Sequence, residues 1–276
     1  MSNFKNFIIL FVAVIILFGC NPEKKLAIEF ASKASRNNVL VLEPENIFKV
    51  NLKTYLLDSI GITNDQNKDS ALLANSEYLY GLNDSLFIAN YILGYKKSLS
   101  GYGVKVFDQN EADVFFSLDS NTHQINIAQI EIEETIYTYR DEALYYDKLY
   151  YHDHNLNAIY VNSWFEYSNL ESDTSNQEIY FATDLITDIP DGYFEYDIFN
   201  SKVRYLYNID SLERDMLYEF AYRIGSEYAR YTFDLLLNNE LNTKIPADQR
   251  SNTYWRYNPG RNTFYPALDD KFIPMD

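Results

Sequence analysis

The chain contains few of the residues on which disulfide scaffolds and most metal sites depend. It has one cysteine, Cys20, and three histidines among 276 residues. A single cysteine cannot form a disulfide within the chain, which excludes a small cross-linked secreted scaffold. A zinc site needs three or four ligands, and only His152 and His154 lie close together in the sequence.

Basic residues are also scarce. Lys and Arg number 23 against 40 Asp and Glu, which gives a formal net charge of −17. Nucleic acids attract basic patches, so this balance argues against nucleic-acid binding. It also argues against a body that lies flat on anionic lipid. Glycine (9) and proline (7) are few, whereas tyrosine (26) and phenylalanine (18) are many, which favours long strands and an ordered core.

Catalytic signatures are missing as well. The sequence has no Gly-x-Ser-x-Gly elbow, glycine-rich phosphate loop or His-Glu-x-x-His motif. Pairs of acids such as Glu133–Glu134 and Asp269–Asp270 arise by chance in so acidic a chain. We therefore expect a non-catalytic protein that uses no cofactor.

A hydrophobic run is present at the N-terminus, directly after Lys5. Residues 7–18 are twelve uncharged residues, mostly apolar. This is too short for a spanning helix, which needs roughly 17–25 residues. The small Gly19 next to Cys20 provides a processing site, so the run is typical of a secretory signal peptide that is removed from the mature protein.

The residues Leu17-Phe18-Gly19-Cys20 resemble the lipobox of bacterial lipoproteins. The resemblance implies that the peptide is cut before Cys20, that the sulfur of Cys20 is diacylated, and that the new amine is acylated. One acyl chain binds a membrane only marginally, whereas several chains hold a protein firmly. Cys20 would then attach the protein to membrane lipid, and acylation would modify the only thiol of the chain.

The residues after Cys20 bear on which membrane face the protein occupies. Related lipoproteins in some envelopes carry consecutive acids there as a surface-export signal. Here Glu23 is followed by Lys24 and Lys25, so that signal is not matched. We expect an outer-membrane lipoprotein that faces the periplasm, with the cell surface as the alternative.

The chain divides into four parts by composition and pattern. Residues 1–19 are the predicted signal peptide, 20–36 a lipidated tether, 37–245 one folded domain, and 246–276 an aromatic and arginine-rich segment docked on that domain.

The first half of the domain predicts a strand, a helix and further strands. The apolar run 39–42 has the length of a buried strand. Asn83 offers a helix cap, and apolar residues at helical spacing follow it as far as Gly101. Residues 104–107 and 112–118 have the composition of strands, whereas the polar residues 61–75 predict an exposed loop.

The second half predicts more strands and a long helix. The alternation over residues 125–139 slips near Ala128 and again near residues 133–134, which predicts a bulged or bent strand. Further strands are expected at 158–167, 178–182 and 193–198. Asp210, with Glu213, predicts a capping box for a helix that ends near residues 238–239. On that helix, Gly225 predicts close packing against the sheet.

This order predicts an α+β fold, a two-layer sandwich with a mixed, mostly antiparallel sheet and two main helices. The first crossover, through the helix after Asn83, should join two parallel strands. Over residues 38–240 the order of elements is similar to that of periplasmic lipoproteins that assist outer-membrane assembly, including the accessory lipoprotein of lipopolysaccharide transport. The resemblance implies a role in envelope assembly through protein contacts.

Two clusters are candidate sites. His152-Asp153-His154 could provide metal ligands, although a polar turn between residues 150–151 and Ala158 is the interpretation we favour. The second cluster, Trp255, Arg256, Tyr257 and Arg261, surrounds an Asn-Pro-Gly turn. Its aromatic rings could stack on sugars or peptides and its arginines could pair with acids. Alternatively, Trp255 and Tyr257 pin the C-terminal tail to the body, which we favour.

Three functions remain open at this point. The leading hypothesis is a non-catalytic, lipid-anchored envelope protein that contacts another envelope protein through its sheet or its C-terminal segment. The second is a glycan-binding surface lipoprotein that uses the C-terminal aromatic residues. The third is a metal-dependent hydrolase built on His152 and His154.

Overall fold

The computed structural model describes residues 22–61, 67–171, 177–200, 202–251, 253–267 and 271–275. The predicted signal peptide, the lipobox with Cys20, and the pair Asp269–Asp270 lie outside these ranges. None of the helices in the described ranges is both long enough and apolar enough to span a bilayer.

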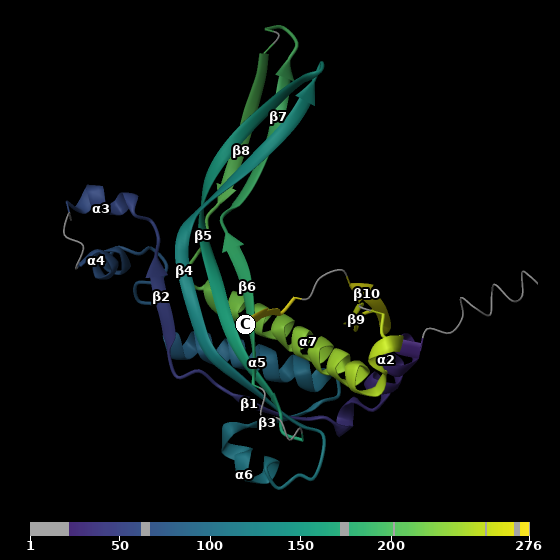
Figure 1. The fold of residues 1–276 in the computed structure, drawn as a ribbon. Helices are drawn as coiled ribbons and strands as arrows, with labels where there is room; N and C mark the ends of the chain where they lie inside the picture. Colours follow the sequence, from purple (N-terminus) through teal and green to yellow (C-terminus); the bar gives the residue numbers. More distant parts are fainter. Residues whose placement is uncertain are drawn as a thin grey trace, which may run out of the picture.

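One mixed sheet forms the centre of the molecule (Figure 1), with the strand order β11-β6-β5-β4-β1-β3 and β2 also paired to β4. The strands are β1 (Asn38–Leu42), β2 (Ile47–Asn51), β3 (Lys105–Asp108), β4 (Thr122–Tyr145), β5 (Lys148–Asn169), β6 (Glu178–Thr187) and β11 (Ile273–Met275). Strand β1 is parallel to β3, as the crossover predicts, and also to β4. Strands β4, β5 and β6 are antiparallel neighbours.

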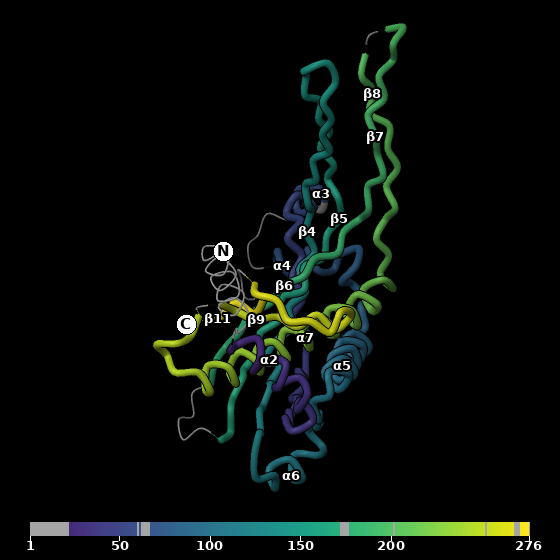
Figure 2. Tube along the Cα trace, turned by 90° about the vertical axis from the view of Figure 1, so that its right-hand side faces the viewer, coloured from purple at the N-terminus to yellow at the C-terminus, as the bar shows by residue number. Residues whose placement is uncertain are grey.

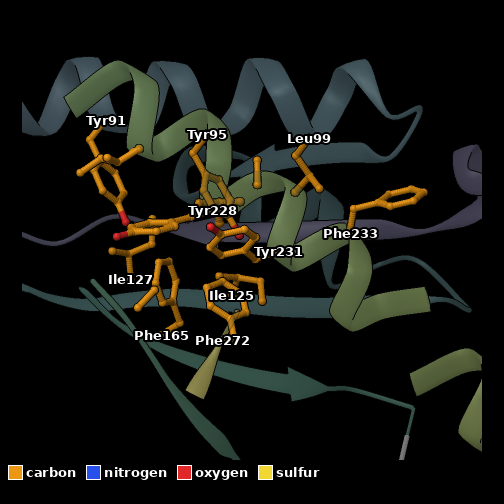
Figure 3. Close-up of a cluster of buried hydrophobic side chains, with 14 of the residues drawn as sticks. Tyr91, Tyr95, Leu99, Ile125, Ile127, Phe165, Tyr228, Tyr231, Phe233 and Phe272 are labelled. Atoms are coloured by element: carbon orange, nitrogen blue, oxygen red, sulfur yellow. The ribbon is translucent and has the colours of Figure 1, made fainter. Parts of the chain in front are cut away.

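Two long helices, α5 (Asp84–Gly101) and α7 (Met216–Lys244), pack together and against this sheet. Buried aromatic rings fill the space between them (Figure 3), including Tyr91 of α5, Tyr228 of α7 and Phe165 of β5. Burying each such side chain stabilises the fold by about 1.5–3 kcal/mol. The prediction of an α+β two-layer sandwich with two main helices is therefore confirmed.

Shorter elements surround this core. They are α2 (Pro22–Ser32), η1 (Ala34–Arg36), α3 (Tyr55–Ile60), α4 (Lys68–Ala74), η3 (Gln109–Glu111), α6 (Ala112–Phe115), η4 (Ala247–Gln249), and a C-terminal hairpin of β9 (Tyr254–Asn258) and β10 (Thr263–Ala267).

Several predicted boundaries match the structure. Strand β1 covers the apolar run 39–42. Helix α5 begins where expected, because the Asn83 side chain accepts a hydrogen bond of 3.0 Å from the Leu86 amide. The pairing of β4 with β5 shifts between Ile127 and Gln129, which confirms the bulge near Ala128.

Other predictions are wrong. The pairing of β4 runs through residues 133–134 without a second shift. Residues 112–115 are helix α6 and not a strand, and α4 occupies half of the predicted loop 61–75. The tether expected over 20–36 is, from Pro22 onward, the packed helix α2. Helix α7 begins only at Met216.

The feature that most distinguishes the molecule is a projecting arm, defined here as residues 137–157, 189–200 and 202–210. Beyond Glu134 the hairpin β4–β5 has no further neighbour in the sheet and extends outward. A second hairpin, β7 (Ile189–Asp197) and β8 (Lys202–Asp210), forms a separate two-stranded sheet. Figures 1 and 2 show the two hairpins side by side, projecting from the same end of the body.

Candidate functional site: the projecting arm

The two hairpins of the arm are joined near their tips by tyrosines. The Tyr145 hydroxyl donates a 2.7 Å hydrogen bond to the carbonyl oxygen of Phe194 in β7. The Tyr145 ring stacks on Tyr196 with 6.2 Å between centroids, and Tyr146 meets the same ring edge-on at 5.1 Å. Because an isolated two-stranded hairpin is marginally stable in water, each hairpin stabilises the other.

Nearer the body, a chain of hydrogen bonds connects the hairpins. The Tyr205 hydroxyl of β8 donates to Asp141 Oδ2 at 2.9 Å and lies 2.9 Å from His154 Nε2. A hydroxyl has one hydrogen, so His154 must donate from Nε2. Burial, together with the hydrogen bond to Asp141, raises the pKa of Tyr205 to about 12. The three side chains therefore form a directed chain from β5 through β8 to β4.

Ring packing completes this junction. His152 stacks on Tyr205 with 4.5 Å between centroids. Gly192 of β7 leaves room for the same ring, because a Cβ at that position would lie 2.1 Å from the Tyr205 hydroxyl. The ring thus covers a glycine on the adjacent strand, an arrangement that fixes strand register.

The two candidate metal ligands serve this junction. His152 and His154 lie within β5, so the predicted polar turn is wrong; the turn is at Tyr146 and Asp147, which have φ of 48° and 62°. The third histidine, His123, lies at the opposite end of the β4–β5 hairpin. Within the described ranges, no three or more His, Cys, Asp or Glu side chains are grouped as metal ligands.

The end of the arm exposes large apolar side chains. Phe199 is 98% exposed, Tyr146 81% and Ile198 78%. Further exposed apolar residues of the arm are Leu144, Leu149, Tyr151, Ile189, Tyr193, Leu206 and Tyr207. The sequence analysis missed this surface, although an Ile-Phe pair followed by Asn-Ser between two strands was a usable signal. Large exposed apolar surfaces mark contact sites.

The arm is also acidic. Residues 137–157 and 189–210 contain eight Asp and Glu and four Lys and Arg. Part of this charge is paired within the arm, because the guanidinium of Arg140 contacts Asp153 at 2.6 Å and 2.9 Å. The remaining negative charge favours a partner with a basic surface.

The C-terminal candidate residues are used for packing. Trp255 is 4% exposed, and its indole N–H donates a 2.8 Å hydrogen bond to Glu23. Its main-chain amide and carbonyl bond the Asn238 side chain of α7 at 2.9 Å and 2.8 Å. The Tyr257 amide donates to Asp234 at 2.9 Å.

The remaining members of this cluster take similar positions. The Tyr257 ring packs on Phe264 with 4.9 Å between centroids. Arg256 lies in β9, and the Arg261 amide bonds the Asn258 side chain at 3.1 Å in the β9–β10 turn. These contacts attach the tail to α7 and bury most of the Trp255 side chain.

A cavity of about 400 Å³ lies beside Trp255, between the end of α7, the start of α2 and the C-terminal segment. Its lining includes Asn238, Asn242 and Arg250. The Arg250 guanidinium donates a 2.7 Å hydrogen bond to the Ile245 carbonyl, and so caps the end of α7. Within this lining, Asn238 and Glu23 bond the C-terminal segment and Arg250 bonds the end of α7.

Comparison with known proteins adds no assignment, because no family model matches the chain and no curated protein matches it significantly.

Proposed function

We propose that this protein is a non-catalytic, lipid-anchored component of a bacterial cell envelope that acts by binding another envelope protein through the arm. The observation that carries the proposal is the 98% exposed Phe199, presented with Ile198 and Tyr146 at the end of a braced, two-hairpin arm. Aromatic residues are enriched among the residues that dominate binding energy at protein interfaces.

The arm suits binding for a further reason. Its two hairpins are cross-linked by Tyr145 and by the chain through Tyr205, so the apolar tip is held in one place before a partner arrives. Pre-organisation of this kind reduces the entropy lost on association. The partner we expect has an apolar pocket for Phe199 and a basic rim that complements the acidic strands.

Two features of the sequence support the anchor and the compartment. The lipobox around Cys20 supports acylation, and several acyl chains make the attachment firm. The order of elements over residues 38–240 supports a role similar to that of lipoproteins which assist outer-membrane assembly. We place the protein at the outer membrane, facing the periplasm.

The two alternatives gain no support from the geometry. Glycan stacking on Trp255 would require the C-terminal segment to move, because this ring is only 4% exposed. For a hydrolase built on His152 and His154, the described residues supply no third His, Cys, Asp or Glu grouped with them, and His154 Nε2 already bonds Tyr205.

Site-specific photocrosslinking in intact cells tests the proposal. A photoreactive phenylalanine at position 199 should crosslink to one envelope protein, whereas the same residue at Phe116, which is 60% exposed on the body, should not. The substitution Phe199→Asp should abolish co-purification of that protein in detergent, and Phe116→Asp should leave it intact.

Contrary results are equally specific. Equal crosslinking from positions 199 and 116 would exclude the arm as the contact. Co-purification of the same envelope protein with the Phe199→Asp variant would exclude it as well. Mass spectrometry that finds the Cys20 sulfur unmodified, or the leader retained, would exclude the anchor.

A further inference from the structure

One face of α2 is basic although the whole chain is acidic. Segment 22–36 contains four Lys and Arg and two Glu, in a chain with a net charge of −17. Lys24, Lys25 and Arg36 are exposed, and the apolar Ile28 between them is 54% exposed. A helix face that combines basic residues with an exposed apolar residue is typical of contact with a membrane surface.

The two acids of this segment do not neutralise that face. Glu23 is buried beneath the C-terminal tail. Glu29 pairs with Lys33 at 2.5 Å, one turn along the helix. Lys25 and Arg36 form no ion pair with any residue that the structure describes. The exposed charge of the face is therefore positive.

The face is held rigidly on the body. On the opposite side of α2, Ala27 and Phe30 are buried, and the Phe30 ring meets Phe233 of α7 edge-on at 5.4 Å between centroids. Glu23 adds hydrogen bonds to the C-terminal tail at 2.6 Å and 2.8 Å. Whatever binds the outer side of α2 thus sets the orientation of the whole body.

We propose that Lys24, Lys25 and Ile28 of α2 contact an anionic phospholipid bilayer, with the basic groups at the lipid phosphates. The inference rests on the proposed lipid anchor. Cys20 precedes the first residue of α2, Pro22, by two positions, and two residues of chain span at most roughly 7 Å. That is within the Debye length of about 8–10 Å at physiological salt, so the charges on the first turn of α2 are felt by the membrane surface.

This orientation places the arm away from the anchor. The helix α7 begins beside the end of β8 and reaches α2 with its far half, and its 29 residues span about 44 Å. Figure 1 shows α2 and the arm on different sides of the body. A bilayer that holds α2 would leave the apolar tip of the arm clear for a protein partner.

Fluorescence quenching in reconstituted vesicles tests the contact. The full chain is produced as the acylated form, in which an introduced cysteine is the only free thiol. A fluorophore on Ser35→Cys, beside α2, is compared with one on Leu149→Cys, in the arm; both positions are exposed. The quencher is a nitroxide on the lipid headgroup, in vesicles of phosphatidylcholine with or without phosphatidylglycerol.

We expect quenching at position 35 and not at 149, stronger when phosphatidylglycerol is present. Lys24→Glu with Lys25→Glu should reduce it to the level in neutral vesicles, whereas Lys105→Glu, an exposed charge reversal elsewhere, should not. Flotation on a density gradient shows separately whether the protein binds the vesicles. If it floats with them but shows no quenching at position 35, or quenching that the double substitution does not change, the contact through α2 is overturned and the anchor is not. A protein that does not float with either vesicle overturns the anchor and the inference together.

Discussion

Gly225 of α7 lies directly against the main chain of Tyr91 in α5, so closely that a Cβ on Gly225 would lie 2.1 Å from the Tyr91 carbonyl oxygen. The relation is reciprocal, because a Cβ on Gly94 of α5 would lie 2.1 Å from the carbonyl oxygen of Tyr222. The two helices therefore cross in backbone contact. The sequence analysis predicted close packing at Gly225, but against the sheet and not against α5.

Substituting this glycine should separate the helices. Gly225→Ala gains about 1 kcal/mol of helix propensity, but the methyl group would force two backbones apart, and overpacking of this kind costs about 1–3 kcal/mol or more. We expect a net loss of stability in urea denaturation. Gly101→Ala, where no heavy atom lies within 4 Å of the new Cβ, is the matched control and should be neutral or stabilising. Equal effects of the two substitutions would refute the close crossing.

A buried ion pair should make stability depend on acid pH. Lys53 Nζ lies 2.9 Å from Glu134 Oε1, and the side chains are 3% and 1% exposed. Burial alone raises the pKa of Glu134, but hydrogen bonds from Ser76 and Lys53 outweigh it and hold the pKa below its usual value. The stabilisation is therefore present at neutral pH and is lost as the pH falls below about 4.

The substitution Glu134→Gln tests this pair. It leaves the buried Lys53 ammonium without its counter-charge, so we expect a loss of about 3–5 kcal/mol in the free energy of unfolding at pH 7. The loss should shrink at pH 3, because below about pH 4 the unfolded chain takes up a proton at Glu134 that the folded state binds less readily, so the unsubstituted protein is itself less stable there. A loss of the same size at both pH values would contradict the assigned charge states.

The buried carboxyl of Asp234 should make stability depend on pH in the opposite direction. Burial raises its pKa to about 7, despite the hydrogen bond from the Tyr257 amide and the charges of Arg230 and Arg256. The folded state then binds a proton that the unfolded state releases near pH 4, so stability falls as the pH rises from about 4 to 7. Asp234→Asn keeps an oxygen for the Tyr257 amide and should remove this fall.

Denaturation at two pH values measures the effect. At pH 8 the Asp234→Asn variant should be more stable than the unsubstituted protein by roughly 2–4 kcal/mol. At pH 4 the two should be close. Parallel stability profiles across this range would show that Asp234 is ionised in the folded state at pH 6.

The junction of the arm yields a local prediction. Tyr205→Phe removes the hydroxyl that bonds both His154 and Asp141, and leaving the buried His154 without this partner costs about 1–3 kcal/mol. We expect faster amide hydrogen exchange in β7 and β8 with little change in α7. Tyr193→Phe, on an exposed ring of the same hairpin, should leave exchange unchanged. Uniform loss of protection across the protein would mean that the arm and the body unfold as one unit.

Local patterns predicted those parts of the fold that local interactions determine. The Asn83 cap and the slip at Ala128 are each decided within a few residues, and both were found. The short apolar run at 112–115 could equally be strand or helix by pattern alone. The capping box of Asp108 and Glu111 was the available signal for a helical start.

Tertiary contacts decided the rest. Asp210 could not cap α7 because it pairs with Ile189 as the last residue of β8. Polar residues around His154 indicated a turn. In the structure His154 lies in a strand, where its side chain hydrogen-bonds Tyr205 of the other hairpin. The arm itself depends on the pairing of two separate hairpins, and alternation along one strand contains no information about that contact.

A carboxylate on α2 holds the C-terminal segment. The Glu23 carboxylate accepts hydrogen bonds from the Ser251 amide at 2.6 Å and from the Trp255 indole at 2.8 Å. Glu23→Ala leaves these donors without their acceptor and should lower the free energy of unfolding by about 2–4 kcal/mol. Glu29→Ala, which breaks only the exposed pair with Lys33, should change the free energy of unfolding far less.

Limited proteolysis separates a local effect from a global one. If Glu23 fastens the tail to α2, Glu23→Ala should expose the segment around Ser251 to cleavage well before α7 is cut, and Glu29→Ala should not. Because Glu23 lies in the first turn of α2, its loss would also weaken the packing of α2 on the body, and the quenching at position 35 should fall in the same variant. Unchanged proteolysis of Glu23→Ala would show that Trp255 and Asn238 hold the tail without the carboxylate.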